Sequence, residues 1–311
     1  MHRSRYPSAQ SLWVEPALDS LEASVLCTVA YADVFDYALT ASQIHRYLVA
    51  FESTYQAVVS ALDEGTWATT RLEQQDGLFA LRGRGDLFQL RTHRAAVAAK
   101  RWPLAQRFGN AIAALPFVRG IALTGALAVG NSDADDDFDY LVITATGRLW
   151  LTRAIIIGLV VKPAARRGYE VCPNYLLSER RLKFRERNLY VAHELAQMVP
   201  LSGMGVYWRL RTSNAWTSRF LPNASGLPRR TARSVTAGSS LGSLGELLLG
   251  TFVGGQLERF ERRRKVRRFA AHEWADTTTC FDADHCKGHF ESNEHLILQA
   301  YAQRLEALAE T

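Results

Sequence analysis

Two aspartates separated by one residue, Asp137 and Asp139, stand at the start of an apolar segment that runs to Thr144. In an extended strand, residues two apart project from the same face of the sheet. We therefore expect the two carboxylates to point together, as ligands that hold divalent metal ions for catalysis. Carboxylate oxygens suit Mg²⁺ (or Mn²⁺), which leaves coordination positions for substrate phosphates. The sequence thus predicts a catalytic metal site formed by Asp137 and Asp139.

A turn rich in small residues precedes this acidic segment and follows an apolar strand candidate. A glycine at such a turn lets backbone N–H groups come close to a triphosphate, and the N-terminus of a helix would favour its negative charge. The predicted nucleotide-binding residues are Thr124, Gly125, Ala126, Asn131 and Ser132.

The order of these residues resembles the nucleotidyltransferase superfamily of DNA polymerase beta. Its pattern is an apolar residue, Gly, then Gly or Ser, a gap of about ten residues, and Asp-x-Asp. Gly125 matches the glycine, and Asp137 and Asp139 match the metal pair, within a resemblance that covers roughly residues 94–178. Further segments look like a little-characterised bacterial branch of such proteins: Cys172-Pro173-Asn174-Tyr175, Ala192-His193-Glu194 and Leu221-Pro222-Asn223.

The resemblance implies Mg²⁺-dependent transfer of a nucleoside monophosphate from an NTP to an acceptor. It brings no known acceptor, so a small molecule, a protein side chain and an RNA end all stay open. The alternative is a non-catalytic regulator that senses nucleotides or binds nucleic acid on a decayed transferase domain.

Two departures from the family pattern keep that alternative open. Ala126 stands where Ser or Gly is usual, so a hydroxyl for the phosphate is missing. A third carboxylate, common on a later strand, is expected at Glu170, the third predicted catalytic residue. By period-2 counting, Glu170 shares a face with Cys172 and Asn174. The other acids of residues 133–136 are expected to be loop acids.

A second polar group falls on a predicted helix over Arg187–Met198. Tyr190, His193, Glu194 and Gln197 lie at i, i+3, i+4 and i+7, which places them on one helical face. They are expected either to line the nucleotide pocket or to form satisfied polar packing.

The elements that must position these residues indicate an α+β fold. It comprises a winged-helix-like N-terminal domain, a central nucleotidyltransferase mixed β-sheet with flanking helices, and a helical C-terminal part. The predicted units are 18–92 for the winged-helix-like domain, 93–225 for the nucleotidyltransferase domain, 226–240 for a linker and 241–311 for the helical region.

Local patterns predict the individual elements. Three short helices within residues 18–65 precede a hairpin around Asp76-Gly77, a strong turn signal. The expected strands are Trp67–Leu72, Leu78–Leu81, Phe117–Leu123, Phe138–Thr144 and Tyr169–Leu177. Longer helices are expected over 94–115, Arg148–Arg167, 241–270 and 292–309.

The distribution of charged residues indicates which partners the chain could attract. The 311 residues carry a net charge of +6, and residues 227–275 alone hold ten basic residues against four acids. Any attraction of acidic partners is therefore local. The helix expected over Ser53–Glu64 contains no Lys or Arg, although a helix that reads a DNA groove needs basic or amide side chains. We expect no sequence-specific DNA binding.

Composition and cysteine content favour a cytoplasmic protein. With 48% hydrophobic and 22% charged residues the chain has globular composition, and its four cysteines are too sparse for a disulfide framework. The most apolar runs, Leu149–Val161 and Leu241–Leu257, are shorter than the roughly 20 residues of a membrane span. Both are expected to be buried helices, with no membrane span.

Overall fold

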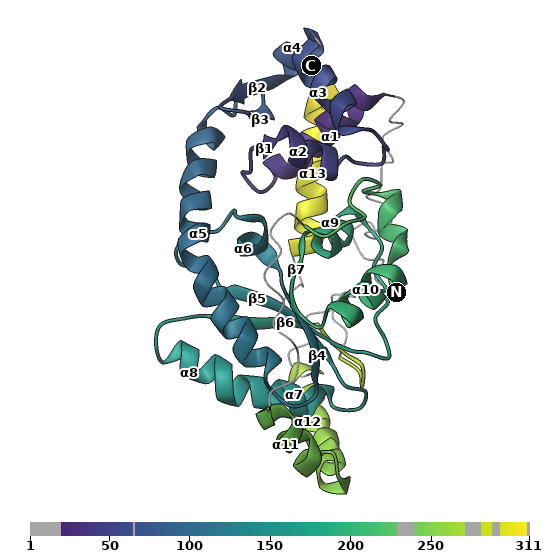
Figure 1. Cartoon of the computed structure of the whole chain (residues 1–311). Coiled ribbons are helices and arrows are strands. Elements are labelled where there is room, and N and C mark those ends of the chain that lie inside the picture. The colour runs from purple at the N-terminus through teal and green to yellow at the C-terminus, as the bar shows by residue number, and fades with distance from the viewer. Residues whose placement is uncertain (1–19, 65, 229–239, 271–280, 288–292, 310–311) are drawn as a thin grey trace, which may run out of the picture.

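The computed structural model of the protein describes residues 20–64, 66–228, 240–270, 281–287 and 293–309 (Figure 1). Its elements form an N-terminal helical part at one end, a central sheet, and two helices at the opposite end. The mixed α+β class predicted from the sequence is confirmed.

The N-terminal part places helices before a small antiparallel sheet of order β1-β3-β2. Its elements are α1 (Leu21–Asp33), β1 (Leu39–Thr40), α2 (Ala41–Arg46), α3 (Tyr55–Glu64), α4 (Thr66–Arg71), β2 (Leu72–Gln75) and β3 (Leu78–Leu81). Thr40 and Gln43 cap the start of α2 reciprocally, as their spacing predicts. The hairpin is also confirmed: Asp76 and Gly77 have φ of 52° and 74°, which the tight turn requires.

The strand predicted over Trp67–Leu72 is wrong, because residues 66–71 form α4 and β2 starts only at Leu72. Ala68 and Leu72 are buried while Thr69 and Thr70 are exposed. Buried positions four residues apart lie on one face of a helix, whereas in a strand every second residue would be buried. Packing therefore overrides the strand preference of the Thr and Trp residues.

The central sheet has the order β7-β4-β5-β6-β8, in which only β5 and β6 run parallel. Its strands are β4 (Val118–Leu123), β5 (Phe138–Thr144), β6 (Val171–Ser178), β7 (Val199–Ser202) and β8 (His285–Lys287). β5 has the predicted bounds, and β4 starts one residue after its predicted start. β6 starts two residues after its predicted start and ends one residue beyond its predicted end. β7 and β8 had no sequence signal that we used.

Helices cover both faces of this sheet. One face packs on α5 (Asp86–Ala113) and on α7 (Leu149–Ile156), which continues through a π-helical turn into α8 (Lys162–Ala165). The other face packs on α9 (Leu189–Gln197) and α10 (Met204–Ser213). Tyr140 and Val142 face the first layer, whereas Leu141 and Ile143 face the second. Odd-numbered positions of β5 therefore point toward α9.

The N-terminal part shares one apolar core with the sheet and with α13 (Asn293–Ala309). Leu298 and Tyr301 of α13 belong to the same cluster as residues of α1, and Arg304 Nε lies 2.6 Å from Asp33 Oδ2. α5 also runs unbroken through the boundary expected near residue 92. The segments expected to be separate domains are thus joined by packing (Figure 1).

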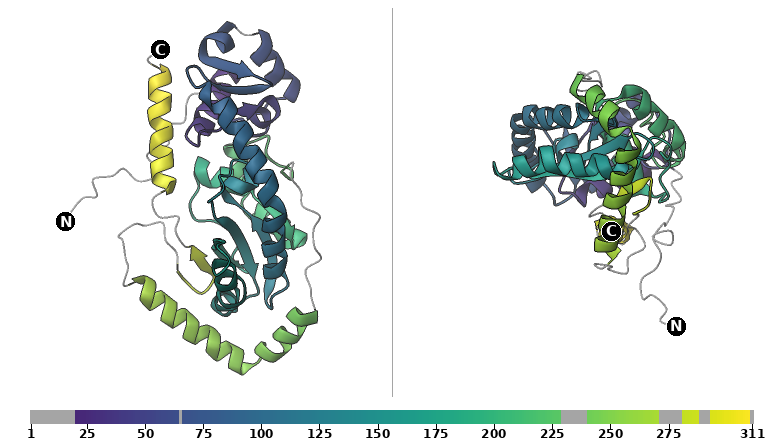
Figure 2. Two further views of the ribbon diagram at one scale, coloured as in Figure 1. Left: turned by 90° about the vertical axis from the view of Figure 1, so that its left-hand side faces the viewer. Right: turned by 90° about the horizontal axis from the view of Figure 1, so that it is seen from below.

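α11 (Ser240–Leu249) and α12 (Phe252–Ala270) form a bent pair at the end remote from the N-terminal part (Figure 2). The expectation that Leu241–Leu257 is buried is wrong, since Leu247 and Phe252 are 73% and 75% exposed. Most of the linker expected over 226–240 lies outside the described residues. Among the helices that the structure describes, none combines the length and apolar character of a membrane span.

Candidate metal centre and adjoining pocket

The structure brings Asp137, Asp139 and Cys172 together at the start of β5 and β6. One ligand atom from each residue lies within 4.8 Å of the others. Asp139 lies in β5, Asp137 directly precedes that strand, and Cys172 is the residue opposite Asp139 in the parallel pair. The donor set is therefore two carboxylates and one thiol.

A β-bulge directly follows the pairing of Asp139 with Cys172. Asp139 pairs with Cys172 but Leu141 pairs with Tyr175, so β6 holds one residue more than β5 between these pairs. A bulge redirects side chains on one side of the extra residue. Asn174, in the bulge, donates a hydrogen bond from Nδ2 to Asp139 Oδ1 at 3.1 Å.

Gly125 allows the close approach of the preceding turn to this group. It begins the short helix α6 (Gly125–Val129) with a φ of +69°, and a Cβ at this position would lie 2.5 Å from Asp139 Oδ2. Thr124 does not cap α6 with its side chain. The backbone N–H groups of Gly125 and Ala126 therefore lie at an uncapped helix start beside a carboxylate.

The electrostatics of the centre suit a cation. Burial, and then the nearby Asp137 carboxylate, raise the pKa of Asp139 to about 8. Burial, followed by the charge of Asp139, raises the pKa of the Cys172 thiol to about 12. A divalent ion between these groups would reverse the like-charge repulsion and favour both ionised forms. Since the donor set matches such an ion, the residues present fit a metal site.

Two arginines of α5 hold the acidic loop that leads into β5. Arg94 forms an ion pair with Asp133 at 3.0 Å. Arg101 donates to Ser132 Oγ and to the main-chain oxygens of Asp133 and Asp136, and lies over the Phe138 ring. Sequence reasoning missed these positioning residues, because no motif relates α5 to the loop.

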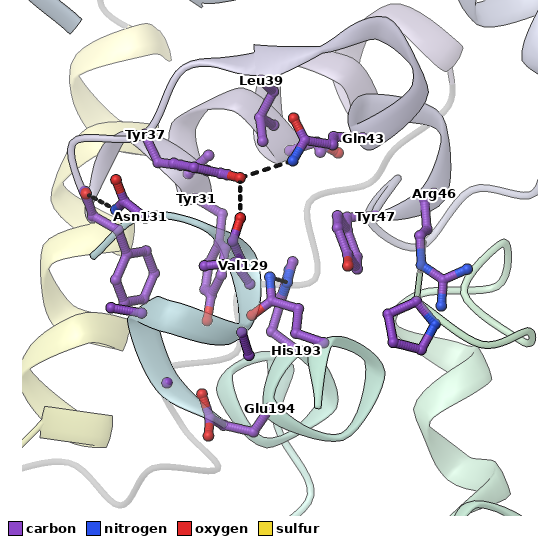
Figure 3. A pocket seen from close by; sticks show the side chains of 18 of the residues that line it. Tyr31, Tyr37, Leu39, Gln43, Arg46, Tyr47, Val129, Asn131, His193 and Glu194 are labelled. Carbon is purple, nitrogen blue, oxygen red and sulfur yellow. Dashed lines mark hydrogen bonds between the residues drawn. The ribbon is translucent and has the colours of Figure 1, made fainter. Parts of the chain in front are cut away.

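A cavity of about 510 Å³ opens between the N-terminal part and the centre (Figure 3). Gly125, Ala126 and Asp139 line one end of it. The aromatic residues that line it come from the N-terminal part and from α9: Tyr31, Phe35, Tyr37, Tyr47, Tyr190 and His193. The Tyr37 hydroxyl donates to Val129 O at 2.7 Å and accepts from Gln43 Nε2 at 2.8 Å, which joins α2 to the end of α6.

The four residues predicted to share a face of α9 all line this cavity. The His193 ring stacks on Tyr31 with centroids 4.1 Å apart, and its Nδ1 lies 3.2 Å from Gln197 Nε2. Burial lowers the pKa of His193 to about 3, so the ring is neutral near pH 7. Its buried Nε2 has no hydrogen-bond partner among the described residues.

Glu194 is the second carboxylate of the cavity after Asp139. Burial raises its pKa to about 7, against a lowering influence from Lys287. Its side chain forms no hydrogen bond or ion pair with any part of the chain that the structure describes. A half-buried carboxylate without a partner is costly, and it is therefore a candidate for a role toward a ligand.

The other predicted site residues are placed less directly. Thr124 is buried beside the cavity, and Asn131 lines it while donating to Phe35 O at 2.9 Å. Ser132 is fully buried and held by Arg101. Glu170 is exposed just before β6 and outside the Asp137, Asp139 and Cys172 group, and its catalytic role stays a prediction.

Comparison with protein-family models, with curated proteins and with solved structures gives no match to this chain.

Proposed function

We propose that this chain is a metal-dependent nucleotidyltransferase that moves a nucleoside monophosphate from an NTP to an acceptor. The observation that carries the proposal is the junction of the Asp137, Asp139 and Cys172 group with the Gly125 turn. A cation ligand set thus lies beside backbone N–H groups suited to phosphate, at one end of a cavity large enough for a small molecule.

The metal would be held by Asp137, Asp139 and Cys172, and it would supply positive charge to the phosphates and to the attacking oxygen. The residues of the chain do the positioning. Asn174 orients the Asp139 carboxylate through its hydrogen bond. The N–H groups of Gly125 and Ala126 face the phosphates, and the aromatic walls limit access of water to the reacting atoms.

Glu194 is the group that receives the acceptor's proton in this proposal. As the acceptor oxygen forms its bond to the α-phosphorus, the bond from that phosphorus to the bridging oxygen breaks and pyrophosphate leaves. The hydroxyl proton passes to the Glu194 carboxylate, which lines the same cavity as Asp139. A cavity of about 510 Å³ favours a small-molecule acceptor over a protein or an RNA end.

The test is transfer of radiolabel from α-labelled NTPs to small molecules of a cell extract, with Mg²⁺ or Mn²⁺ and with chelator. We expect labelled product only with metal, and a loss of about a thousandfold or more for Asp139→Asn or Asp137→Asn. Asp135→Asn is the matched control, because Asp135 is an exposed acid of the same loop. Transfer at the wild-type rate by Asp139→Asn would disprove the proposal.

The replacement of a third carboxylate by Cys172 favours a second candidate, a nucleotide sensor without transfer activity. The two functions differ in turnover and not in binding. A protein that binds an NTP with metal, by calorimetry, yet releases no pyrophosphate in the presence of extract would be a sensor. Release of pyrophosphate that requires Asp137 and Asp139 would exclude it.

A further inference from the structure

The outer side of α11 and α12 carries an apolar surface that the proposed function does not use. Of the twelve large hydrophobic residues exposed in the described chain, seven lie between residues 244 and 260. Six of them, each more than half exposed, define what we name the α11–α12 patch: Leu244, Leu247, Leu248, Phe252, Val253 and Phe260. Contiguous exposed apolar side chains of this kind mark interaction surfaces.

Contacts on the inner side fix which way the two helices face. Glu246 of α11 accepts hydrogen bonds from Arg119 Nη1 at 2.7 Å and from the Phe117 N–H at 2.8 Å. Glu258 of α12 accepts from the backbone N–H groups of Trp150 and Leu151 at the start of α7. These contacts fix both helices on the protein, so the α11–α12 patch faces away from it.

The same outer side is basic. Arg259 and Arg263 are exposed, and they follow Phe252 by seven and eleven residues, which returns them to its side of the helix. The three acidic side chains of α11 and α12 are all engaged within the protein: Glu246 with Arg119, Glu258 with the α7 N-terminus, and Glu261 with Arg264 at 2.7 Å. No acid among these described residues offsets Arg259 and Arg263.

We propose that the α11–α12 patch binds the surface of an anionic lipid bilayer. Leu, Val and Phe on one side of a helix, together with arginines on that side, are the composition of a helix that lies in the membrane interface. Nucleic acid would leave the six apolar residues in water. A second copy seated on the same patch would offer Arg259 and Arg263 no acidic partner, because Glu246, Glu258 and Glu261 are already engaged. A lipid surface with anionic headgroups satisfies both features.

The test is flotation of the full-length chain with vesicles of phosphatidylcholine, with or without about a third of phosphatidylglycerol. We expect binding to the anionic vesicles that weakens as salt screens the charges, and little binding to phosphatidylcholine alone. The double substitution Leu247→Asp with Phe252→Asp should lower binding at least tenfold. Both side chains are over 70% exposed, so the fold should tolerate the change.

Leu296→Asp is the matched control, because Leu296 is 57% exposed on α13, which packs against α1 and α9. It should leave vesicle binding unchanged, whereas Arg259→Glu with Arg263→Glu should reduce both the binding and its salt dependence. Equal binding by wild type and the Leu247, Phe252 variant would overturn the proposal. So would an absence of vesicle binding, or a self-association in sedimentation velocity that the same variant abolishes. None of these readouts involves nucleotide transfer.

Discussion

Cys172 puts a sulfur atom into a site otherwise made of carboxylate oxygens. Thiolates bind softer ions more strongly than they bind Mg²⁺. We expect the wild-type chain to bind Cd²⁺ with a thiolate-to-metal charge-transfer absorption in the ultraviolet, and Cys172→Ser to lose that absorption. Cys172→Asp should strengthen Mg²⁺ binding, measured by calorimetry, since it supplies a third carboxylate.

Glu170→Gln provides the comparison at a neighbouring residue. Because Glu170 is exposed and outside the ligand group, we expect its removal to change metal affinity less than threefold or so, well under 1 kcal/mol. A larger loss of metal binding in Glu170→Gln than in Cys172→Ser would restore the carboxylate predicted from the sequence as the third ligand.

At the residue scale, the proximity of the two aspartates could be predicted from their spacing alone. Asp137 and Asp139 lie in one ligand group, two residues apart where the chain enters β5. Period-2 counting placed Cys172 on one face with Glu170 and Asn174, but it could not show which of them lies opposite Asp139, because the fold sets the register between β5 and β6. Glu194 was found as one member of a helical face, but its lack of a partner depends on elements distant in the chain.

At the scale of elements, the composition of α3 and the contacts of the adjoining surface indicate the role of the N-terminal part. It carries no Lys or Arg and ends in Asp63-Glu64. The adjoining surface instead docks on the core: Asn223 donates to His45 O at 2.9 Å, and the Ala50 N–H donates to Phe220 O at 2.7 Å. The part is thus a wall of the cavity, and its likeness to a winged helix stays a prediction.

We therefore expect the full-length chain to show no sequence-selective DNA binding. Groove recognition needs amide or basic side chains that reach base edges, with phosphate contacts around them. Fluorescence anisotropy with a random duplex pool, followed by enrichment of any bound sequences, is the measurement. A sequence enriched with sub-micromolar affinity that depends on Gln56 of α3 would contradict this expectation.

Element bounds were predictable where a strand is apolar along nearly its whole length. β5 alternates between two apolar layers, and its bounds follow from that segment's hydrophobicity. Residues 66–71 were mistaken for a strand because propensity there disagrees with tertiary packing. The segment 241–257 was expected to be buried because it is apolar, yet no property of the sequence states whether another surface covers it.

At the scale of the whole molecule, three buried titrating groups set the pH dependence of stability. Asp139 and Glu194 have pKa values raised to about 8 and about 7, so the folded, metal-free chain keeps protons that the unfolded chain has already lost. Stability then falls as pH rises through that range. His193 acts oppositely, since its lowered pKa makes the folded chain lose a proton first, but this contribution is nearly complete by about pH 7.5.

We expect the free energy of unfolding in chelator to drop by about 1–2 kcal/mol between pH 6.5 and 8. Thermal unfolding of the wild type and of Asp139→Asn measures it, and the variant should show a flatter profile. Added Mn²⁺ or Mg²⁺ should raise the wild-type midpoint most at pH 8, where the carboxylate is free to bind it. A wild-type midpoint that rises over this range would show that Asp139 is ionised in the metal-free fold.

The ion pair between Asp33 and Arg304 also has a consequence for synthesis. α1 shares its core with Leu298 and Tyr301, so a nascent chain cannot complete that core until translation has passed residue 301. Translation proceeds at about 5–20 residues per second, so part of the apolar surface of α1 stays uncovered for tens of seconds. During that interval α1 is a natural client for a ribosome-associated chaperone.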